Sequence, residues 1–173
     1  LAGRPTRRKG VLDFIDIIGR LRSLGVPVHG LLVGDFPRRR EAGARRRIDA
    51  ALAAAGAGDA MTLTGFRRDL REIMAISDAV LSLSLQPESH GRTVSEALAL
   101  GRPVAGYAHG GVCEQLSGLF PEGSVAVGDT AGMVDKLAGW YREPPSLEAV
   151  SPWPLQRTLD DTLRVYRELA GDP

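Results

Sequence analysis

The chain has a single cysteine and almost no net charge. Of its 173 residues only Cys113 is a cysteine, which excludes an internal disulfide and a multi-cysteine metal site. Lysine and arginine total 22 against 21 acidic residues, so no broadly basic surface for nucleic acid is expected. No apolar run reaches the length of a membrane-spanning helix. With 43% hydrophobic and 25% charged residues, the composition is typical of one globular domain.

Several motifs for cofactor or metal binding are also missing. No Gly-x-Gly-x-x-Gly follows a predicted strand, which counts against a dinucleotide oxidoreductase. No phosphate loop ending in Lys-Ser or Lys-Thr is present, which counts against a nucleoside-triphosphate hydrolase. No Asp-x-Asp follows a strand to hold a divalent metal, since Asp160 and Asp161 fall in the last predicted helix. Cys113 has no evident histidine partner, so a catalytic thiol is not expected.

Strand and helix patterns alternate along the chain. Segments with apolar residues at helical spacing follow short apolar runs that stop at a glycine. This alternation predicts an α/β fold, a Rossmann-like and mostly parallel sheet with helices on both faces. Strands are expected at 1–3, 28–33, 61–64, 79–85, 103–107 and 125–127, and helices at 11–24, 38–55, 69–76, 93–100, 112–116, 131–141 and 155–169.

The first residues suggest an excised part of a longer protein. Residues 1–3 have the character of the end of a strand, and no methionine precedes them. The basic residues after them lead into a patterned helix, so no signal peptide is predicted. We expect a cytoplasmic protein, with a peripheral position at the inner membrane face as the alternative. The arginine runs 38–40 and 45–47 are offset by Glu41 and Asp49, which favours a solvated helix face over contact with anionic lipid.

The most informative segment is 87–98, where a strand gives way to a turn and then a helix. Gly91 allows a bound group to approach the backbone, and the first amides of the helix lack partners, which predicts a phosphate or diphosphate site. Glu96 would accept hydrogen bonds from a ribose, and Glu88 lies before the turn, where a sugar would be. From spacing alone, the alternative is that Glu96 is a solvated helix residue and Glu88 a loop residue.

Other loops follow strands at the same expected edge of the sheet, where ligands of parallel sheets bind. Arg4 or Lys9 could neutralise a diphosphate and stabilise its departure, the alternative being a basic surface loop. The loop at 65–67 could hold a nucleobase, although Phe66 is more often a core residue. His109, before two glycines, is either a polar lining of the same cleft or an ordinary loop histidine.

Together these segments resemble glycosyltransferase family 4, a family of retaining enzymes with the GT-B fold. Residues 88–96 fit its Glu-x7-Glu signature, and 96–104 are similar to its most recognisable stretch. Many members carry phenylalanine where His90 stands and a small apolar residue where Arg92 stands. Further matching segments, in the expected order, are 2–10, 32–34, 65–66, 77–79, 110–114 and 127–129, so that the resemblance runs from Leu1 to about Tyr141.

The resemblance implies a role for each candidate site residue. The catalytic residues are Arg4 and Lys9, which would bind the diphosphate and assist its departure, and Glu88, which would contact hydroxyls of the donor sugar. No metal and no cofactor are implied, because basic residues and a helix terminus replace the cation. The implied donor-binding residues are Gly65, Phe66 and Arg67 near the base, His90, Gly91, Arg92 and Thr93 near the sugar and phosphates, and Glu96 at the ribose.

The implied reaction moves a hexose-type sugar from a UDP, GDP or ADP donor to an acceptor hydroxyl with retention. The acceptor would be a glycan, a lipid-linked sugar or a small molecule. Residues 1–173 would form the C-terminal donor-binding domain, inactive without an N-terminal acceptor domain. The helix at 155–169 would pack toward that domain, leaving Val165, Tyr166 and Leu169 exposed here. Alternatives are a sugar-nucleotide epimerase of the same architecture, a non-catalytic nucleotide-sensing or scaffolding domain, and a purely structural Rossmann-like domain.

Overall fold

The computed structural model describes residues 1–36, 41–150 and 155–171. Its strands form two parallel ladders: β1 (Gly30–Val33) pairs with β2 (Met61–Gly65), and β4 (Val104–Tyr107) lies between β3 (Val80–Ser82) and β5 (Ser124–Val125). Residues 1–3 extend the first ladder, because the Val33 N–H donates to the Leu1 carbonyl at 3.0 Å and the Gly3 N–H to the Val33 carbonyl at 2.8 Å. The predicted parallel α/β arrangement is therefore confirmed.

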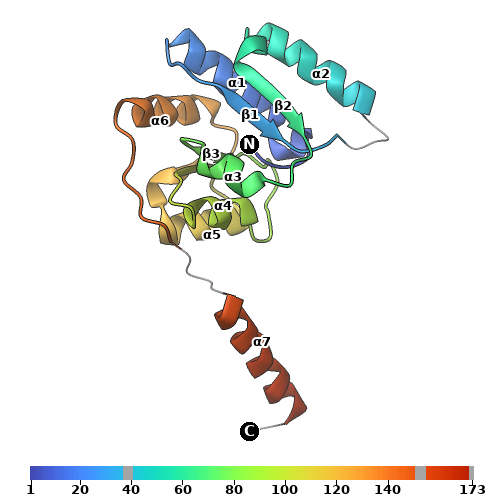
Figure 1. Ribbon diagram of the computed structural model, residues 1–173, viewed down its shortest axis with the longest axis vertical. Coiled ribbons are helices and arrows are strands. Elements are labelled where there is room, and N and C mark those ends of the chain that lie inside the picture. The colour runs from blue at the N-terminus through green and yellow to red at the C-terminus, as the bar shows by residue number, and fades with distance from the viewer. Residues whose placement is uncertain (37–40, 151–154, 172–173) are drawn as a thin grey trace.

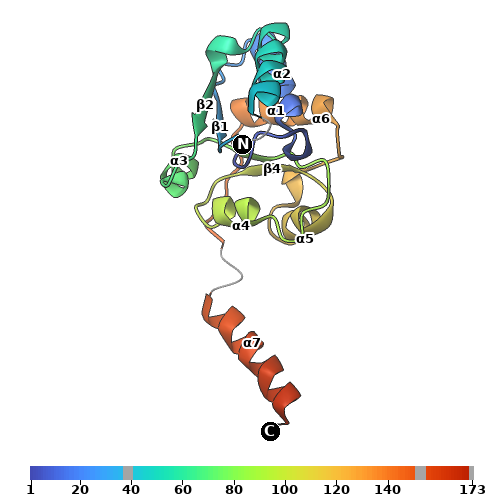
Figure 2. The same cartoon turned by 90° about the vertical axis from the view of Figure 1, so that its right-hand side faces the viewer.

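Helices cover both faces of these ladders (Figures 1 and 2). On one face lie α1 (Val11–Ser23), α2 (Glu41–Ala54) and α6 (Thr130–Arg142), with α1 packed against both of the others. On the other face lie α3 (Leu70–Ala75), α4 (Arg92–Leu98) and α5 (Gly110–Leu119). The last helix, α7 (Leu155–Ala170), stands away from this body (Figure 1). The described residues also form three short 3₁₀ helices that were not predicted, η1 (Arg7–Lys9), η3 (Gly58–Ala60) and η4 (Pro121–Gly123).

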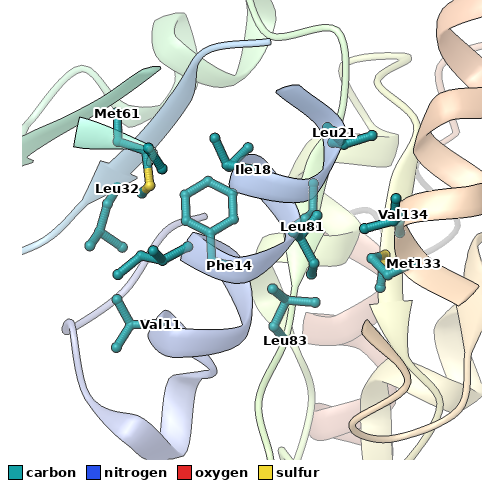
Figure 3. Close-up of a cluster of buried hydrophobic side chains, with 14 of the residues drawn as sticks. Val11, Phe14, Ile18, Leu21, Leu32, Met61, Leu81, Leu83, Met133 and Val134 are labelled. Carbon is teal, nitrogen blue, oxygen red and sulfur yellow. The ribbon is translucent and has the colours of Figure 1, made fainter. Parts of the chain in front are cut away.

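The core consists of two hydrophobic clusters, one on each face. Neighbouring residues of a strand point to opposite faces, so Val104 packs with α4 and α5 while Ala105 packs with α1 and α6. Figure 3 shows Phe14 and Ile18 of α1 lying between side chains of the two ladders. Burial of each such side chain contributes roughly 1.5–3 kcal/mol. Helix α1 is therefore the element that joins the first ladder to the second.

The strand predicted at 79–85 is too long, because β3 ends at Ser82. Beyond that point the chain pairs with the basic loop, since the Leu85 N–H donates to the Arg8 carbonyl at 2.7 Å. Gly10 permits this approach: its φ is +69°, and a Cβ there would lie 2.0 Å from the Leu83 carbonyl oxygen. The apolar pattern continues to Leu85 although the ladder does not.

Other boundaries differ by a few residues. The strand predicted at 28–33 begins at Gly30, and the one predicted at 125–127 is 124–125, which leaves Val127 45% exposed. The helix predicted at 93–100 lies at 92–98, and the one predicted at 112–116 extends over 110–119. Of the helix predicted at 38–55, residues 38–40 lie outside the described residues, and the rest forms α2.

Candidate functional site

Lys9 and Glu88 meet at the carboxyl end of the strands, although 79 residues separate them in the sequence. Lys9 Nζ donates to Glu88 Oε1 at 2.6 Å, and the two side chains are 33% and 21% exposed. The Ser84 hydroxyl donates to the same oxygen. Partial burial alone would raise the pKa of Glu88, but the hydrogen bonds from Lys9 and Ser84 outweigh it and hold that pKa below its ordinary value. Glu88 is therefore a carboxylate at neutral pH.

These side chains line a small recess, open to solvent, with a cavity volume of about 10 Å³. The recess lies where the two ladders meet, with Leu1 and Ala2 contributed by one side and residues 81–84 by the other. Gly91 and Thr93, at the start of α4, complete the lining. The structure thus brings four of the predicted site residues to one place, namely Lys9, Glu88, Gly91 and Thr93.

The other predicted site residues at this edge, Arg4, His90, Arg92 and Glu96, are exposed and do not line the recess. Exposure keeps each of them accessible to a ligand that extends beyond the recess. Their assigned roles in donor binding remain predictions.

The segment at 88–91 packs tightly against the start of α5, which explains three glycines. The Gly111 N–H donates to the Glu88 carbonyl at 2.8 Å. A Cβ on Gly111 would lie 2.7 Å from the His90 Cα, and one on Gly110 would lie 2.6 Å from the Glu88 carbonyl oxygen. Gly91 has a φ of +76°, which only glycine adopts without strain. Tight packing therefore fixes the backbone that carries Glu88.

Two residues beside the recess, Ser84 and Gln115, are not among the predicted site residues. Gln115 Nε2 donates to the His90 carbonyl and, at 3.4 Å, to the Gly91 carbonyl. Each has another polar residue close by in the sequence, Ser82 for Ser84 and Glu114 for Gln115, so no local signal singles them out. His109 is not part of the lining, because its Nε2 donates to the Ser84 carbonyl at 2.7 Å.

The loop after β2 is held differently, by side chains at the surface. Phe66 is 66% exposed, so its interpretation as a core residue is wrong. Its N–H donates to Asp35 Oδ1 at 2.9 Å. Arg67 Nε donates to Asp69 Oδ1 at 2.8 Å, and the hydrogen bonds from Arg67 lower the pKa of Asp69 to about 2. The aromatic face of Phe66 is thus accessible to a ligand.

The described residues contain neither a metal-binding cluster nor a membrane-spanning helix. Over residues 1–36, 41–150 and 155–171, no three side chains of His, Cys, Asp or Glu gather where they could hold a metal ion. No helix among these described residues has the length together with the apolar character that crossing a bilayer requires.

Residues 1–143 match the model of a protein family described as "Glycosyl transferases group 1". The chain belongs to this family. The match includes every candidate site residue, from Arg4 to Glu96, and ends before α7.

Two curated relatives of this group 1 glycosyltransferase chain come from Streptomyces. The chain is 32% identical to the 2-deoxystreptamine glucosyltransferase of Streptomyces kanamyceticus, with 96% of the chain and 37% of the relative covered. It is 30% identical to the 2-deoxystreptamine N-acetyl-D-glucosaminyltransferase of Streptomyces fradiae, with 98% of the chain and 41% of the relative covered. The chain therefore spans about two fifths of the length of these relatives. The relatives give no support to the epimerase alternative.

Solved structures agree on the fold. A glycosyltransferase from Rickettsia africae has a TM-score of 0.86 at 20% identity, covering 99% of this chain and 47% of that one. Anabaena HepE in complex with UDP-glucose has a TM-score of 0.71 at 26% identity, covering 80% of this chain and 37% of that one. These likenesses confirm the Rossmann-like architecture of a GT-B glycosyltransferase for the group 1 domain.

Proposed function

We propose that this chain is the donor-binding domain of a retaining glycosyltransferase of family 4. The enzyme transfers a hexose-type sugar from a nucleotide diphosphate to an acceptor hydroxyl. The observation that carries this proposal is the contact between Lys9 and Glu88, at 2.6 Å, in a recess beside the start of α4. A cation and an ionised carboxylate, held together at the ligand-binding edge of a parallel sheet, match the diphosphate and the sugar hydroxyls of such a donor.

The chemistry of each residue fits a step of this reaction. The Lys9 ammonium binds diphosphate oxygens and offsets the negative charge that builds on them as the bond to the sugar breaks. Arg4, exposed at the same edge, supplies a second cation. Glu88 accepts hydrogen bonds from sugar hydroxyls and so orients the sugar. In this proposal the cationic side chains do the work of a metal ion, so the reaction is metal-independent.

For the donor, we favour a UDP-linked hexose over GDP- and ADP-linked sugars. The HepE complex with UDP-glucose supports this choice, as do the glucosyl and N-acetylglucosaminyl groups in the names of the two relatives. In this arrangement Gly65, Phe66 and Arg67 lie at the base and Glu96 at the ribose. His90, Gly91, Arg92 and Thr93 would lie along the phosphates and sugar.

For the acceptor, a small molecule of the 2-deoxystreptamine kind is favoured over a glycan or a lipid-linked sugar, because both relatives are named for it. We assign the reaction to carbohydrate biosynthesis in the cytoplasm. A test is to supply 2-deoxystreptamine and a lipid-linked acceptor separately to the full-length protein and to measure sugar transfer to each.

Helix α7 fits the proposal as a contact element. Its apolar side chains recur at helical spacing along one face, and none of its residues is buried. We propose that this face packs against an acceptor-binding domain of the same enzyme. The residues of the face and their exposed fractions are Leu155 (74%), Leu159 (46%), Leu163 (47%), Tyr166 (64%) and Leu169 (81%).

Titration of the folded chain with UDP, GDP and ADP, followed by NMR or calorimetry, tests donor binding. We expect a response from at least one of them, and a response from none would contradict the proposal. For the full-length protein, NMR of the product shows whether the anomeric configuration of the donor is kept. Activity that disappears in EDTA would contradict metal independence, and nucleotide binding without any sugar transfer would favour the non-catalytic alternative.

A further inference from the structure

Two polar side chains are buried among the residues that the structure describes, and both bond to the same short segment. Ser84 is 4% exposed and Gln115 is 3% exposed. They come from different elements, Ser84 from the chain just beyond β3 and Gln115 from α5. The segment that both contact is 88–91, which carries Glu88 at the recess. Burying a polar group is unfavourable unless it is hydrogen-bonded, so the position of these bonds is informative.

Ser84 acts directly on the Glu88 carboxylate. Its hydroxyl donates to Oε1, and Lys9 Nζ donates to the same oxygen at 2.6 Å. The second carboxylate oxygen, Oε2, has no hydrogen-bond partner among the described residues. Ser84 is itself held in place, because its carbonyl accepts a hydrogen bond from His109 Nε2 at 2.7 Å. One oxygen of Glu88 is therefore fixed from within the protein while the other is left for a ligand.

Gln115 acts on the backbone of the same segment. Its Nε2 donates to the His90 and Gly91 carbonyls. Its Oε1 is buried and has no partner within the described part of the chain. The hydrogen bonds of the amide thus go only to this segment. The buried, unpaired oxygen lowers the stability of the fold, so stability alone does not account for a glutamine at this position. A hydrophobic side chain would remove the unpaired oxygen together with the hydrogen bonds to this segment, so the presence of the amide indicates that Gln115 serves the segment it holds.

We propose that Ser84 and Gln115 are positioning residues that hold Glu88 so that its Oε2 meets a hydroxyl of the donor sugar. Ser84 orients the carboxylate, and Gln115 fixes the backbone turn that follows it. This inference rests on the proposed function, because it requires that Glu88 bind the sugar of a nucleotide-linked donor.

The test compares the affinities of the natural full-length protein for UDP-glucose and for UDP by calorimetry. Loss of the fold lowers the affinity for both ligands, whereas a misplaced Glu88 lowers only the affinity for UDP-glucose, which carries the sugar. Ser84→Ala is expected to lower the affinity for UDP-glucose about tenfold and that for UDP by less than about twofold. Its matched control is Ser77→Ala, which removes a partly buried hydroxyl that donates to the Ile73 carbonyl at 2.7 Å and does not line the recess. Ser77→Ala should bind both ligands as the wild type does.

Gln115→Met removes the amide while keeping a side chain of similar length, and Leu116→Met is its control on the same helix. Gln115→Met should again lower the affinity for UDP-glucose more than the affinity for UDP, and Leu116→Met should change neither affinity. A double-mutant cycle adds a second readout: in a Glu88→Gln background, Ser84→Ala should have little further effect on UDP-glucose, because both act through one carboxylate. Thermal unfolding confirms that each variant is folded, and if Gln115→Met is not, the Ser84 variants decide the matter.

The outcomes are distinct. A wild-type protein that binds neither ligand contradicts the proposed function. The positioning role is overturned if the wild type binds both ligands and Ser84→Ala either leaves both affinities unchanged or lowers both by the same factor. Additive effects of Ser84→Ala and Glu88→Gln would show that Ser84 acts elsewhere.

Discussion

The two sides of the candidate site differ in how their side chains are held. At the recess, Lys9 and Glu88 are partly buried, and their geometry is set by bonds from the buried Ser84 and Gln115. At the loop after β2, Phe66 and Arg67 are exposed, and surface carboxylates restrain them. Surface ion pairs contribute little to stability, typically about 0–1 kcal/mol, whereas packing against backbone atoms resists displacement strongly. Substitutions at the recess should therefore affect both fold and function, and those at the loop mainly function.

Gly10→Ala should have the largest effect, because it forces the basic loop away from the recess. The added Cβ would lie 2.0 Å from the Leu83 carbonyl oxygen, at a backbone φ of +69°. We expect the free energy of unfolding to fall by about 3 kcal/mol, from overpacking and left-handed strain together. Urea denaturation measures this change.

The control for Gly10→Ala is Gly118→Ala. Gly118 lies in α5, and a Cβ there meets no atom within 4 Å. This change should raise the free energy of unfolding by up to about 1 kcal/mol, because alanine favours the helix. Equal stability of Gly10→Ala and the wild type would show that the basic loop does not approach Leu83 as described.

Lys9→Met should have the next largest effect, on the rate of sugar transfer. Loss of the ammonium removes the charge that stabilises the leaving diphosphate, and a fall of about 100-fold, or about 2.7 kcal/mol, is expected. Initial rates with the full-length protein measure it. Arg7→Ala, which removes a neighbouring exposed cation, should keep most of the activity. Equal losses in both variants would mean that the loop contributes only a general positive charge.

Tyr107→Phe should have a smaller effect, on stability. The Tyr107 hydroxyl donates to Asp13 Oδ2 at 2.7 Å and ties β4 to α1, so its loss should cost about 1 kcal/mol. Burial, with the hydrogen bond to Asp13, raises the pKa of Tyr107. A raised pKa gives stability that is full below the unfolded value of about 10 and is lost as the pH rises toward the folded value. Denaturation between pH 8 and about pH 11 should show this loss in the wild type and less of it in Tyr107→Phe.

Phe66→Ala should have the smallest effect on the fold. The side chain is 66% exposed, so the free energy of unfolding should change by less than about 0.5 kcal/mol. The affinity for UDP should nevertheless fall several-fold, because the substitution removes the aromatic face on which the base would stack. Calorimetry with UDP on the same samples separates the two quantities. A variant that is clearly destabilised would indicate that the loop, like the recess, is part of the packed structure.

Local sequence patterns predicted the helices well and the longer-range contacts poorly. Helix α1 was predicted at 11–24 and spans 11–23, and α6 was predicted at 131–141 and spans 130–142, because each has a clear apolar face. The end of β3 could not be predicted, since the alternation with Leu83 and Leu85 continues beyond Ser82 while the Leu85 N–H bonds to the basic loop. That change depends on a contact between distant segments, which periodicity does not contain.

The same limit applies to the candidate site. The general rule for parallel strands places the loops that carry Lys9 and Glu88 at one edge of the sheet, but it does not predict their contact at 2.6 Å, which only the structure shows. Their shared partner Ser84 and the turn-binding Gln115 could not be assigned, because a sequence shows that a residue is polar but not which distant carbonyl or carboxylate it reaches. The roles of all the candidate site residues in donor binding remain predictions, and Arg4 and Glu96 are in addition exposed, outside the recess.

The division of the strands into two ladders has a consequence for dynamics. Lys9 follows the segment that extends the first ladder, and Glu88 follows the last strand residues of the second, so their ion pair crosses the boundary between them. A ligand that binds both side chains would hold the boundary closed and oppose local opening there. The amide of Leu85, which bonds to the Arg8 carbonyl across this boundary, would then exchange its hydrogen with solvent more slowly. A bound donor would in this way link the two ladders and stabilise their arrangement.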